Sequence, residues 1–385
     1  MKLNKSLRIG IDVRLLIRRR GIGNYVYNLL QELVKLESQH KFILYSDSED
    51  VAYAVPNDSR FILKIIGPKF YPLWEQIVLP IHAVRDNLDV LHCPANAGPY
   101  LLPSKIKLIL TIHDVMYMLP SSALPTSPSL YQSIGRKYLS WIVPLVAKNA
   151  TALITVSNYS KFDILKHFTI DENKIFVIHE AAGKNFKKIA KSIASSILKN
   201  LNIPDRFIMA FGAIDPRKNT SKIIYAFKHF INLIKSDHHL IIVGLSQSEK
   251  HHFTKQVQKL GISSNVTFLG FVSEVELIAL YNNAQAMLYP SLYEGFGIPV
   301  LEAMACGTPV IGSTSASIPE ISGDAALLID PTNLEELYTS LYEISNNKKL
   351  REDLSKKGFI QANKFSWSKL AFETLSVYNG CIKLN

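Results

Sequence analysis

The sequence predicts an α/β protein made of two doubly wound domains, each with a parallel sheet covered by helices on both faces. Its 385 residues are too many for one ordinary hydrophobic core. Apolar residues make up 48% and charged residues 19%, a normal globular composition. Near-continuous apolar runs alternate with helix-length segments in each half of the chain, which indicates parallel strands buried on both faces.

The first half contains seven runs with the length and composition of buried strands. They cover residues 7–13, 41–46, 61–66, 89–93, 107–113, 152–157 and 174–179. The segments between them that have helical length cover residues 24–36, 73–85, 131–148 and 158–167. We therefore predict a first Rossmann-like domain over residues 1–183.

The second half repeats this arrangement after a lysine-rich stretch, which we interpret as a linker over residues 184–204. Its predicted strands cover residues 206–212, 239–244, 266–270, 286–290, 309–313 and 326–330, and helical segments follow residues 218, 246, 273, 297 and 333. We assign residues 205–365 to the second domain. Open parallel sheets bind ligands at the carboxyl ends of their strands, so we expect a ligand cleft between the domains.

One stretch, PSLYEGFGIPVLEAMACGTP over residues 290–309, combines a strand end, a glycine loop and a short helix. Its turn-forming and helix-ending Gly and Pro residues predict a helix that starts near Gly297 or Ile298. Backbone N–H groups at such a helix start favour an anionic or strongly hydrogen-bonding ligand. Glu294 precedes the helix and Glu302 lies about a turn inside it, so the two carboxylates could face the two ends of one elongated polar ligand.

Arg217 and Lys218 follow the first strand of the second half directly, with Asn219 and Thr220 at a plausible helix N-cap. Two adjacent cations at a strand end are suited to neutralise a diphosphate, since Arg offers a bidentate fork and Lys a point charge. The alternative is a solvated surface pair.

Two places in the first half carry weaker signals of the same kind. The loop RRRGIGNY places Gly21 and Gly23 between a strand and a helix, where backbone N–H groups could approach a phosphate, although a tight turn explains it equally well. The strand 107–113 ends in His113, which could bond a sugar hydroxyl or have a structural role. His179–Glu180 ends the last strand and is a weaker candidate still.

The formal net charge of +11 fits acidic partners such as nucleotide phosphates or an anionic membrane surface. The basic residues are spread over both halves, which argues against a nucleic-acid partner. Three distant cysteines and the polar N-terminus predict a cytoplasmic protein without disulfides. No pattern typical of a metal site is found. Residues 70–84 and 138–150 are apolar with Trp and basic neighbours, which suits either a membrane interface or a core-facing helix.

At these residues the chain resembles family 4 of the retaining glycosyltransferases with the GT-B fold (glycosyl transferases group 1). The resemblance rests on EGFGIP with EAMACGTP at residues 294–309, on DPRKN at 215–219, and on IPE with GDAA at 318–326. IDVRLL, GIGNY, LHCPAN and TIHD resemble the branch of bacterial mannosyltransferases. The terminal segment 366–385 resembles the helix that in this fold crosses back to the first domain.

The resemblance implies roles for the candidate residues. Glu302 would hold the ribose of a nucleotide-sugar donor, and Glu294 a hydroxyl of its sugar. Backbone N–H groups of Phe296, Gly297 and Ile298 would hold the sugar further. Arg217 and Lys218 would stabilise the departing diphosphate, which Gly21 and Gly23 would also approach, and His113 would contact the donor sugar. No metal or other cofactor would be required.

The implied function is transfer of mannose from GDP-mannose, with retention, to a glycan or lipid-linked saccharide in surface polysaccharide synthesis (lipopolysaccharide, O-antigen or capsule). Such an enzyme could also contact the cytoplasmic face of the inner membrane. The alternatives are a UDP-sugar-dependent glucosyl or N-acetylglucosaminyl transferase, another GT-B enzyme such as a nucleotide-sugar epimerase, or a non-catalytic binding protein. The basic loop Arg18–Arg20 and the HEAAGKNF segment depart from the common family pattern.

Overall fold

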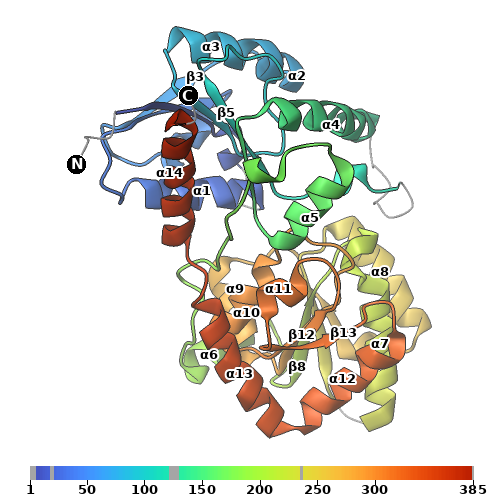
Figure 1. The fold of residues 1–385 in the computed structure, drawn as a ribbon. Helices are drawn as coiled ribbons and strands as arrows, with labels where there is room; N and C mark the ends of the chain where they lie inside the picture. The colour runs from blue at the N-terminus through green and yellow to red at the C-terminus, as the bar shows by residue number, and fades with distance from the viewer. Residues whose placement is uncertain (1–5, 18–20, 121–129, 235–236, 384–385) are drawn as a thin grey trace. The chain divides into compact units, whose positions relative to one another are not determined.

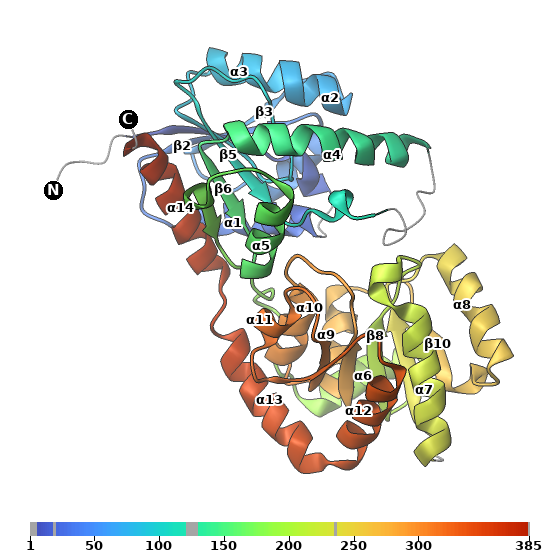
Figure 2. The same cartoon turned by 45° about the vertical axis from the view of Figure 1, so that its right-hand side comes forward.

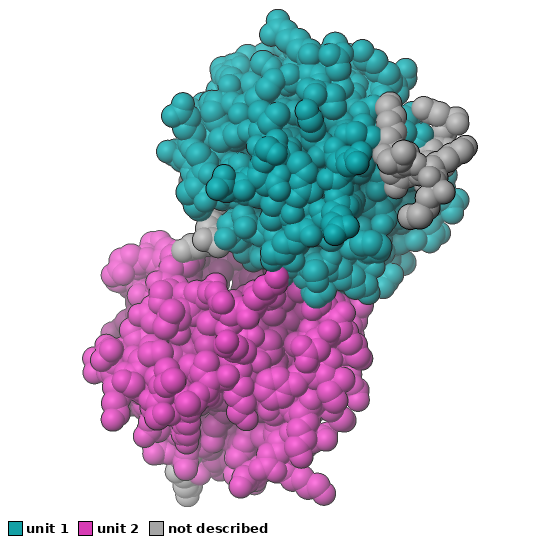
Figure 3. Space-filling view, turned by 90° about the vertical axis from the view of Figure 1, so that its left-hand side faces the viewer, with its two compact units in different colours: residues 1–118, 127–180, 366–385 teal, residues 119–126, 181–365 magenta. Residues whose placement is uncertain are grey.

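The computed structural model describes residues 6–17, 21–120, 130–234 and 237–383. The basic loop Arg18–Arg20 lies outside these residues. The chain divides into two compact units (Figure 3). Unit 1 comprises Met1–Met118, Ser127–Glu180 and Ser366–Asn385, and unit 2 comprises Leu119–Thr126 and Ala181–Phe365.

The sheet of unit 1 contains all seven strands that the sequence predicts there, within the described residues. They are β1 (Arg8–Asp12), β2 (Lys41–Ser46), β3 (Phe61–Ile65), β4 (Val90–Cys93), β5 (Lys107–Ile112), β6 (Ala152–Thr155) and β7 (Ile175–Val177). Their order is β3-β2-β1-β4-β5-β6-β7, and every adjacent pair is parallel. Parallel strands need helical crossovers, which the intervening segments supply.

Helices cover both faces of this sheet, because alternate apolar residues of each strand point to opposite sides. The helical elements are α1 (Ile22–Leu33), α2 (Tyr71–Leu73), α3 (Leu79–Arg85), α4 (Leu130–Asn149) and α5 (Asn158–His167), with a π-helical turn η3 (Trp74–Val78) between α2 and α3. Tyr45, Leu91 and Leu110 on one face pack with buried residues of η3, α3, α4 and α5. Helix α4 lies beside α2 and α3 (Figures 1 and 2).

The C-terminal helix α14 (Trp367–Lys383) belongs to unit 1 and packs against α1, as the sequence predicted (Figure 1). A buried histidine ties it to the sheet. His92 Nδ1 is 2.7 Å from the Tyr378 hydroxyl, and His92 Nε2 is 2.7 Å from Thr111 Oγ1. Burial, reinforced by the charge of His113, lowers the pKa of His92 to about 3, so the ring stays neutral at ordinary pH.

Unit 2 has a second parallel sheet, whose described strands are the six that the sequence predicts. They are β8 (Phe207–Phe211), β9 (His239–Val243), β10 (Val266–Phe268), β11 (Ala286–Tyr289), β12 (Val310–Ser313) and β13 (Ala326–Ile329). Their order is β10-β9-β8-β11-β12-β13. The predicted α/β class with two Rossmann-like units is therefore confirmed.

Eight helices of unit 2 surround this sheet within the described residues (Figure 2). They are α6 (Lys191–Asn200), α7 (Thr220–Ile234), α8 (Gln247–Lys259), α9 (Glu274–Asn283), α10 (Ile298–Ala305), α11 (Ile318–Ser322), α12 (Leu334–Asn346) and α13 (Lys348–Ala362). Among the described helices of both units, none combines the length and apolar character that crossing a bilayer requires.

Helix α6 contradicts the prediction of a linker over residues 184–204. The segment forms part of unit 2, and α6 packs against α9 with Ala194 and Leu198 buried. These two apolar side chains lie four residues apart and therefore on the same face of the helix. The lysines that suggested a linker lie on the solvent side of this segment, where they do not oppose helix formation.

Each sheet reverses its strand order once. In unit 1 the chain moves from β1 outward to β3 and then returns to place β4 on the other side of β1. In unit 2 the same reversal places β11 beside β8. At such a switch point the two connections leave in opposite directions, and their divergence opens a crevice at the carboxyl ends of the strands. The topology therefore marks one ligand-binding edge in each unit.

Substituting Tyr378→Phe should destabilise unit 1. The change removes the hydroxyl but keeps the ring, so one nitrogen of the buried His92 loses its partner. A buried polar group left unsatisfied costs about 1–3 kcal/mol, and we expect a loss of that size in the free energy of unfolding measured with urea.

Phe372→Tyr is the matched control, because Phe372 lies on the same helix and is 62% exposed. This change should alter the unfolding free energy by less than about 0.5 kcal/mol. Equal stability of Y378F and the wild-type protein would show that α14 does not depend on the His92 contact.

Candidate active site

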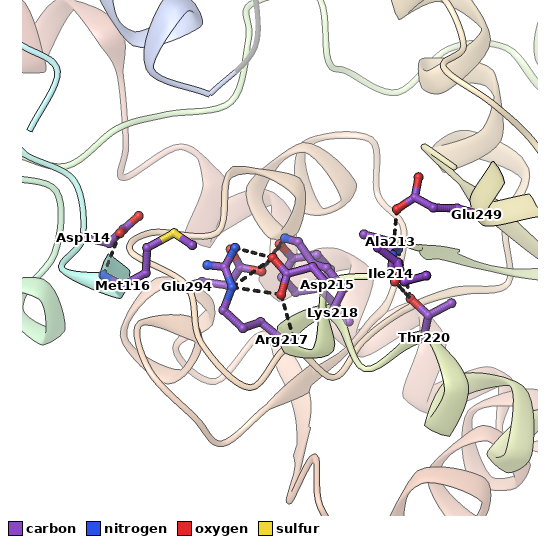
Figure 4. A network of polar contacts seen from close by, with 11 residues as sticks. Asp114, Met116, Ala213, Ile214, Asp215, Arg217, Lys218, Thr220, Glu249 and Glu294 are labelled. Carbon is purple, nitrogen blue, oxygen red and sulfur yellow. Dashed lines mark hydrogen bonds and ion pairs between the residues drawn. The ribbon is translucent and has the colours of Figure 1, made fainter. Parts of the chain in front are cut away.

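The switch point of unit 2 brings Lys218 and Glu294 together (Figure 4). Lys218 follows β8 in the 3-10 turn η7 (Pro216–Lys218), and Glu294 follows β11. Lys218 Nζ donates to Glu294 Oε1 at 2.6 Å and lies 3.2 Å from the Tyr289 hydroxyl, which is itself 2.9 Å from the same carboxylate oxygen. The three groups form one compact, mostly buried polar cluster.

Both charged groups of this cluster are held ionised. Burial raises the pKa of Glu294, but the opposite charge and hydrogen bond of Lys218 outweigh it and leave the pKa below its ordinary value. Burial likewise lowers the pKa of Lys218, and Tyr289 and Glu294 together raise it above its ordinary range. An ammonium has three N–H groups, so the two contacts of Lys218 leave one for a ligand.

Arg217 is oriented by an acidic neighbour two residues before it (Figure 4). Asp215 caps η7 by accepting from the Arg217 backbone N–H, and Arg217 Nη2 lies 2.5 Å from the same carboxylate. Asn219 and Thr220 were predicted at the N-cap of α7, and Asn219 does precede the helix, where its carbonyl accepts from the Ile223 N–H. Its backbone is left-handed (φ 59°), and its side chain donates to the carbonyls of Pro290 and Pro331.

The loop before α10 is shaped by Gly297 and Ser317. Gly297 caps α10, confirming the predicted helix start, and its φ of 106° is strained for other residues. A side chain there would also bring Cβ within 2.7 Å of Ile318. The Ser317 hydroxyl contacts the carbonyls of Glu294 and Phe296 at 3.1 and 2.6 Å. The Phe296 carbonyl and the Gly297 N–H belong to the same trans peptide, in which C=O and N–H point in opposite directions. Because the carbonyl points to Ser317, the Gly297 N–H points away from it.

Glu302 lies in α10, one turn after Ile298, and contacts a different tyrosine. The Tyr281 hydroxyl donates to Glu302 Oε2 at 3.0 Å. Burial raises the pKa of Glu302 to about 7, with a smaller contribution from the charge of Glu274, and the Tyr281 hydrogen bond only partly opposes the shift. Glu302 can therefore exchange a proton near neutral pH, whereas Glu294 stays ionised.

In unit 1, Gly21 precedes the first residue of α1 and Gly23 lies buried in its first turn. Gly21 has a φ of 50°, and a Cβ built on it would meet no atom within 4 Å. Glycine is thus favoured at position 21 by the backbone conformation and not by close packing. The backbone N–H groups of Asn24 and Tyr25 donate to the Gly21 carbonyl. The predicted strand–glycine–helix arrangement is confirmed.

His113 follows β5 and pairs with Glu180, which the sequence marked only as a weaker candidate. His113 Nδ1 is 3.3 Å from Glu180 Oε1, and Nε2 is 3.0 Å from the Pro94 carbonyl. A carbonyl only accepts hydrogen bonds, so Nε2 carries a hydrogen. Tyr25 packs edge-on against the ring at 4.7 Å. Both ring nitrogens therefore have protein partners, and contact of His113 with a donor sugar stays a prediction.

The switch point of unit 1 holds a cluster that sequence reasoning missed. Arg14, just after β1, bonds Asp12 and stacks on Trp74 at 3.5 Å from the ring centroid. Next to Trp74, the buried Glu75 accepts from Tyr138 at 2.8 Å. Burial raises the pKa of Glu75 to about 7, although hydrogen bonds from Tyr138 and Tyr71 oppose the shift. Trp74 and Glu75 lie in the π-helical turn η3, which only the structure reveals, and such turns are frequent at functional sites.

The candidate residues of unit 2 thus fall into two groups. Lys218 and Glu294 touch each other, and Arg217 and Phe296 lie beside them in the same two loops, whereas Glu302 has its own partner in α9. Over the described ranges, no group of three or more His, Cys, Asp or Glu side chains is placed to hold a metal ion. The arrangement offers fixed cations, one ionised carboxylate and one carboxyl with a pKa near neutrality.

Two family models match this chain. The model described as Glycosyl transferases group 1 matches residues 195–361, and the model described as Glycosyltransferase Family 4 matches residues 19–181. The first match lies within unit 2, and the second covers most of the first 181 residues, the larger part of which belongs to unit 1.

Curated relatives and solved structures point in the same direction. The O-antigen chain mannosyltransferase B of Escherichia coli is 26% identical over 298 residues, which cover 77% of this chain and 76% of the relative. The MMP alpha-(1->4)-mannosyltransferase of Mycolicibacterium hassiacum is 31% identical over 308 residues, covering 77% and 72%. The Anabaena protein HepE, solved with UDP and glucose, has a TM-score of 0.73 at 17% identity, covering 96% and 100%, which shows a shared fold.

The raised pKa of Glu302 predicts a pH-dependent contribution to stability. Between about pH 4.5 and 7 the folded protein keeps a proton that the unfolded chain has already lost. This contribution is therefore present at low pH and is lost as the pH rises through about 7. In Glu302→Gln it should vanish, so the difference in unfolding free energy between the two proteins should change by roughly 3 kcal/mol over this range.

Urea unfolding at several pH values measures this difference. Glu343→Gln is the control, because Glu343 is exposed on α12 and should follow the wild-type curve. A constant offset between E302Q and the wild-type protein at all pH values would contradict the raised pKa.

Proposed function

Because this chain belongs to the glycosyl transferases of group 1 and family 4, we propose that it transfers mannose from GDP-mannose, with retention at the anomeric carbon, to a glycan or lipid-linked saccharide. The chain is a glycosyltransferase. What we propose is the identity of its donor, the identity of its acceptor and the stereochemistry of the transfer. The product would be a surface polysaccharide such as O-antigen, lipopolysaccharide or capsule.

The observation that carries the proposal is the Lys218–Glu294 cluster at the switch point of unit 2. A departing nucleoside diphosphate gains negative charge as its bond to the sugar breaks. A fixed ammonium next to that charge lowers the energy of the transition state without a reorganisation cost. Lys218 is held in place by Glu294 and Tyr289, so it meets this requirement.

The other residues of unit 2 are assigned by the family resemblance. We propose that Glu294 accepts hydrogen bonds from a hydroxyl of the donor sugar, a role that suits a carboxylate kept ionised by Lys218. Backbone N–H groups of Phe296, Gly297 and Ile298 would hold the same sugar. Glu302 would bond the ribose, and Arg217 would bind the diphosphate together with Lys218.

From unit 1 we assign Gly21 and Gly23 to the donor diphosphate and His113 to the donor sugar, on the resemblance alone. Its switch point, with Arg14 and Glu75, is the candidate for the acceptor. Tyrosine hydroxyls and a carboxyl group are well suited to bind sugar hydroxyls.

The proposed reaction exchanges one bond for another at the anomeric carbon. The bond to the diphosphate oxygen breaks, and a bond to the acceptor oxygen forms on the same face of the ring. The proton of the acceptor hydroxyl passes to the departing phosphate oxygen, and the nucleoside diphosphate leaves. This route needs no pair of carboxylates flanking the bond, unlike glycosidic hydrolysis. It agrees with a Glu294 that stays ionised rather than acting as an acid.

Relatives support mannose over other sugars. The two curated relatives described above are named mannosyltransferases, one of O-antigen chains. HepE was solved with UDP and glucose, so a UDP-sugar is the competing donor to test. The proposal also keeps the expected cytoplasmic location, where the enzyme would contact the anionic surface of the inner membrane that carries lipid-linked acceptors.

GDP-mannose should stabilise the protein more than UDP-glucose or ADP-glucose in a thermal-shift screen. A ligand present at a hundredfold to thousandfold excess over its Kd stabilises by roughly 2.7–4.1 kcal/mol. The stabilisation should be lost in Lys218→Ala and Glu294→Ala, and both variants should lack transfer activity while remaining folded.

Lys228→Ala on α7 is the control and should retain the full shift and activity. Unchanged activity of either K218A or E294A would overturn the assigned roles. A larger shift with UDP-glucose would identify a UDP-sugar, and not GDP-mannose, as the donor. The class of reaction would be unaffected.

Transfer should be insensitive to EDTA. We propose that Arg217 and Lys218 supply the positive charge that a metal supplies in other nucleotide-sugar enzymes, so chelation should leave the rate nearly unchanged. The measurement is the initial rate with and without EDTA, followed by addition of Mg²⁺. A large loss that Mg²⁺ restores would contradict binding of the diphosphate by the two side chains alone.

A further inference from the structure

The helical segment from Phe70 to Val84 in unit 1 exposes a continuous apolar stripe. Its members recur every three or four residues, the spacing of one helical face. Their exposed fractions are 61% for Phe70, 38% for Leu73, 51% for Ile77, 45% for Ile81 and 37% for Val84. The opposite side of the same segment is firmly anchored, since Trp74, Leu79 and Ala83 are fully buried. The stripe therefore belongs to a rigid element of the fold.

The neighbouring helix α4 adds a second stripe beside the first. Ile134 and Trp141 are 66% and 64% exposed. At about 100° of rotation per residue, both lie within roughly 60° of Tyr138 around the helix axis. Tyr138 marks the seam between the two helical segments, because its hydroxyl contacts Glu75 and Gln76.

The two stripes share one solvent-facing side of this seam. Leu73 and Ile77 lie close to Gln76 along the chain, three residues before it and one after it. Both stripes are exposed and lie next to the contact between the two helical segments. The opposite side of this contact is hydrophobic core, so the two stripes face solvent together. Tyr100 donates its backbone N–H to Gln76 Oε1, which places Leu101, 72% exposed, at the same seam. Figures 1 and 2 both show α4 alongside α2 and α3.

The charges around these stripes have one sign. Residues 98–107 and 130–149 contain no Asp or Glu, and residues 61–85 contain only the buried Glu75. The cations are exposed: Lys69 and Arg85 lie at the two ends of the first stripe, and Lys137 and Lys148 lie on α4. A face that combines large apolar side chains with cations and lacks exposed carboxylates is complementary to an anionic, partly apolar surface.

We propose that this face, made of Phe70, Leu73, Ile77, Ile81, Val84, Leu101, Ile134 and Trp141 with the four cations around them, docks the protein on a bilayer containing anionic phospholipid. The inference rests on the proposed function in one respect, since a lipid-linked acceptor would be presented at such a surface. The apolar side chains enter the boundary between headgroups and acyl chains, and the lysines and arginine contact phosphates. No helix needs to cross the bilayer.

The docking face is continuous with the switch point of unit 1. Leu73 and Ile77 flank Trp74 and Glu75 in the chain, and the latter two point inward to Arg14 and Tyr138. A saccharide held at the lipid surface would therefore meet the candidate acceptor cluster on the inner side of the same helical segment. This link gives the π-helical turn a role in joining the two.

One tryptophan reports directly on docking. The chain has three Trp residues, and Trp74 and Trp367 are 0% and 1% exposed while Trp141 is 64% exposed. Adding vesicles of phosphatidylethanolamine and phosphatidylglycerol should shift the emission of the wild-type protein to shorter wavelength. Trp141→Phe should remove this shift and still sediment with the vesicles.

Sedimentation with the same vesicles measures the affinity. Binding should be strong with phosphatidylglycerol present, weak with phosphatidylcholine alone, and reduced by salt. Ile77→Gln combined with Ile81→Gln should lower partitioning about tenfold. The control is Phe162→Gln with Phe372→Gln, which removes side chains that are 63% and 62% exposed in α5 and α14 of the same unit.

Three outcomes would overturn the proposal. The first is equal vesicle binding by the I77Q/I81Q variant and the control, and the second is no vesicle binding by the wild-type protein. The third is a wild-type dimer in light scattering that I77Q/I81Q converts to monomer, which would assign the face to a second copy of the chain. The GDP-mannose thermal shift, measured in parallel, should be unchanged in I77Q/I81Q. Absence of vesicle binding by the wild-type protein, with its GDP-mannose shift intact, overturns the docking face and leaves the proposed reaction standing.

Discussion

The reversal of strand order at the centre of each sheet is the constraint on which the candidate sites depend. In unit 2 it makes β8 and β11 hydrogen-bonded neighbours, although many residues separate them in the chain. Adjacent strands lie about 4.8 Å apart, so side chains that follow their carboxyl ends are within reach of each other. Lys218 and Glu294 occupy these two positions. Their ion pair is a direct result of the topology.

That ion pair in turn determines what each group can do. Lys218 keeps Glu294 ionised despite burial, so the carboxylate can accept hydrogen bonds and is poorly suited to donate a proton. Glu302 lies eight residues later without a cation beside it, and burial raises its pKa to about 7. Two glutamates of one short motif therefore have different chemical properties because of residues elsewhere in the chain.

Unit 1 uses the same topology with different chemistry. Its switch point lies between β1 and β4, where Arg14 bonds Asp12 and stacks on Trp74. The carboxyl group nearby, Glu75, is bonded by neutral donors and has a pKa near neutrality. The unit 2 site thus presents the cations Arg217 and Lys218, and the unit 1 site adds aromatic rings and tyrosine hydroxyls to its Arg14–Asp12 pair. The first set suits a diphosphate, and the second suits an uncharged saccharide.

Much of the fold follows from local patterns. The strands of both sheets are buried on both faces, and their apolar runs could be recognised without any partner. The Gly297 turn and the start of α10 could also be predicted from neighbouring residues alone, because they depend on the backbone conformation of one glycine. The lysines of segment 184–204 are typical of a linker, but the four-residue spacing of Ala194 and Leu198 gives it a buried helical face. The side-chain partners of Asn219, the carbonyls of Pro290 and Pro331, could not be predicted because they come from two distant loops.

By itself the sequence determined the two-unit α/β architecture, the glycine loop with its two glutamates and the family to which the chain belongs. The tertiary structure alone decided which residues meet: Lys218 with Glu294, His113 with Glu180, and Arg14 with Trp74. It also decided that the apolar stripe from Phe70 to Val84 faces solvent. Periodicity reveals that a helix has an apolar face. Which face is covered, and by what, depends on the order in which the strands and helices pack.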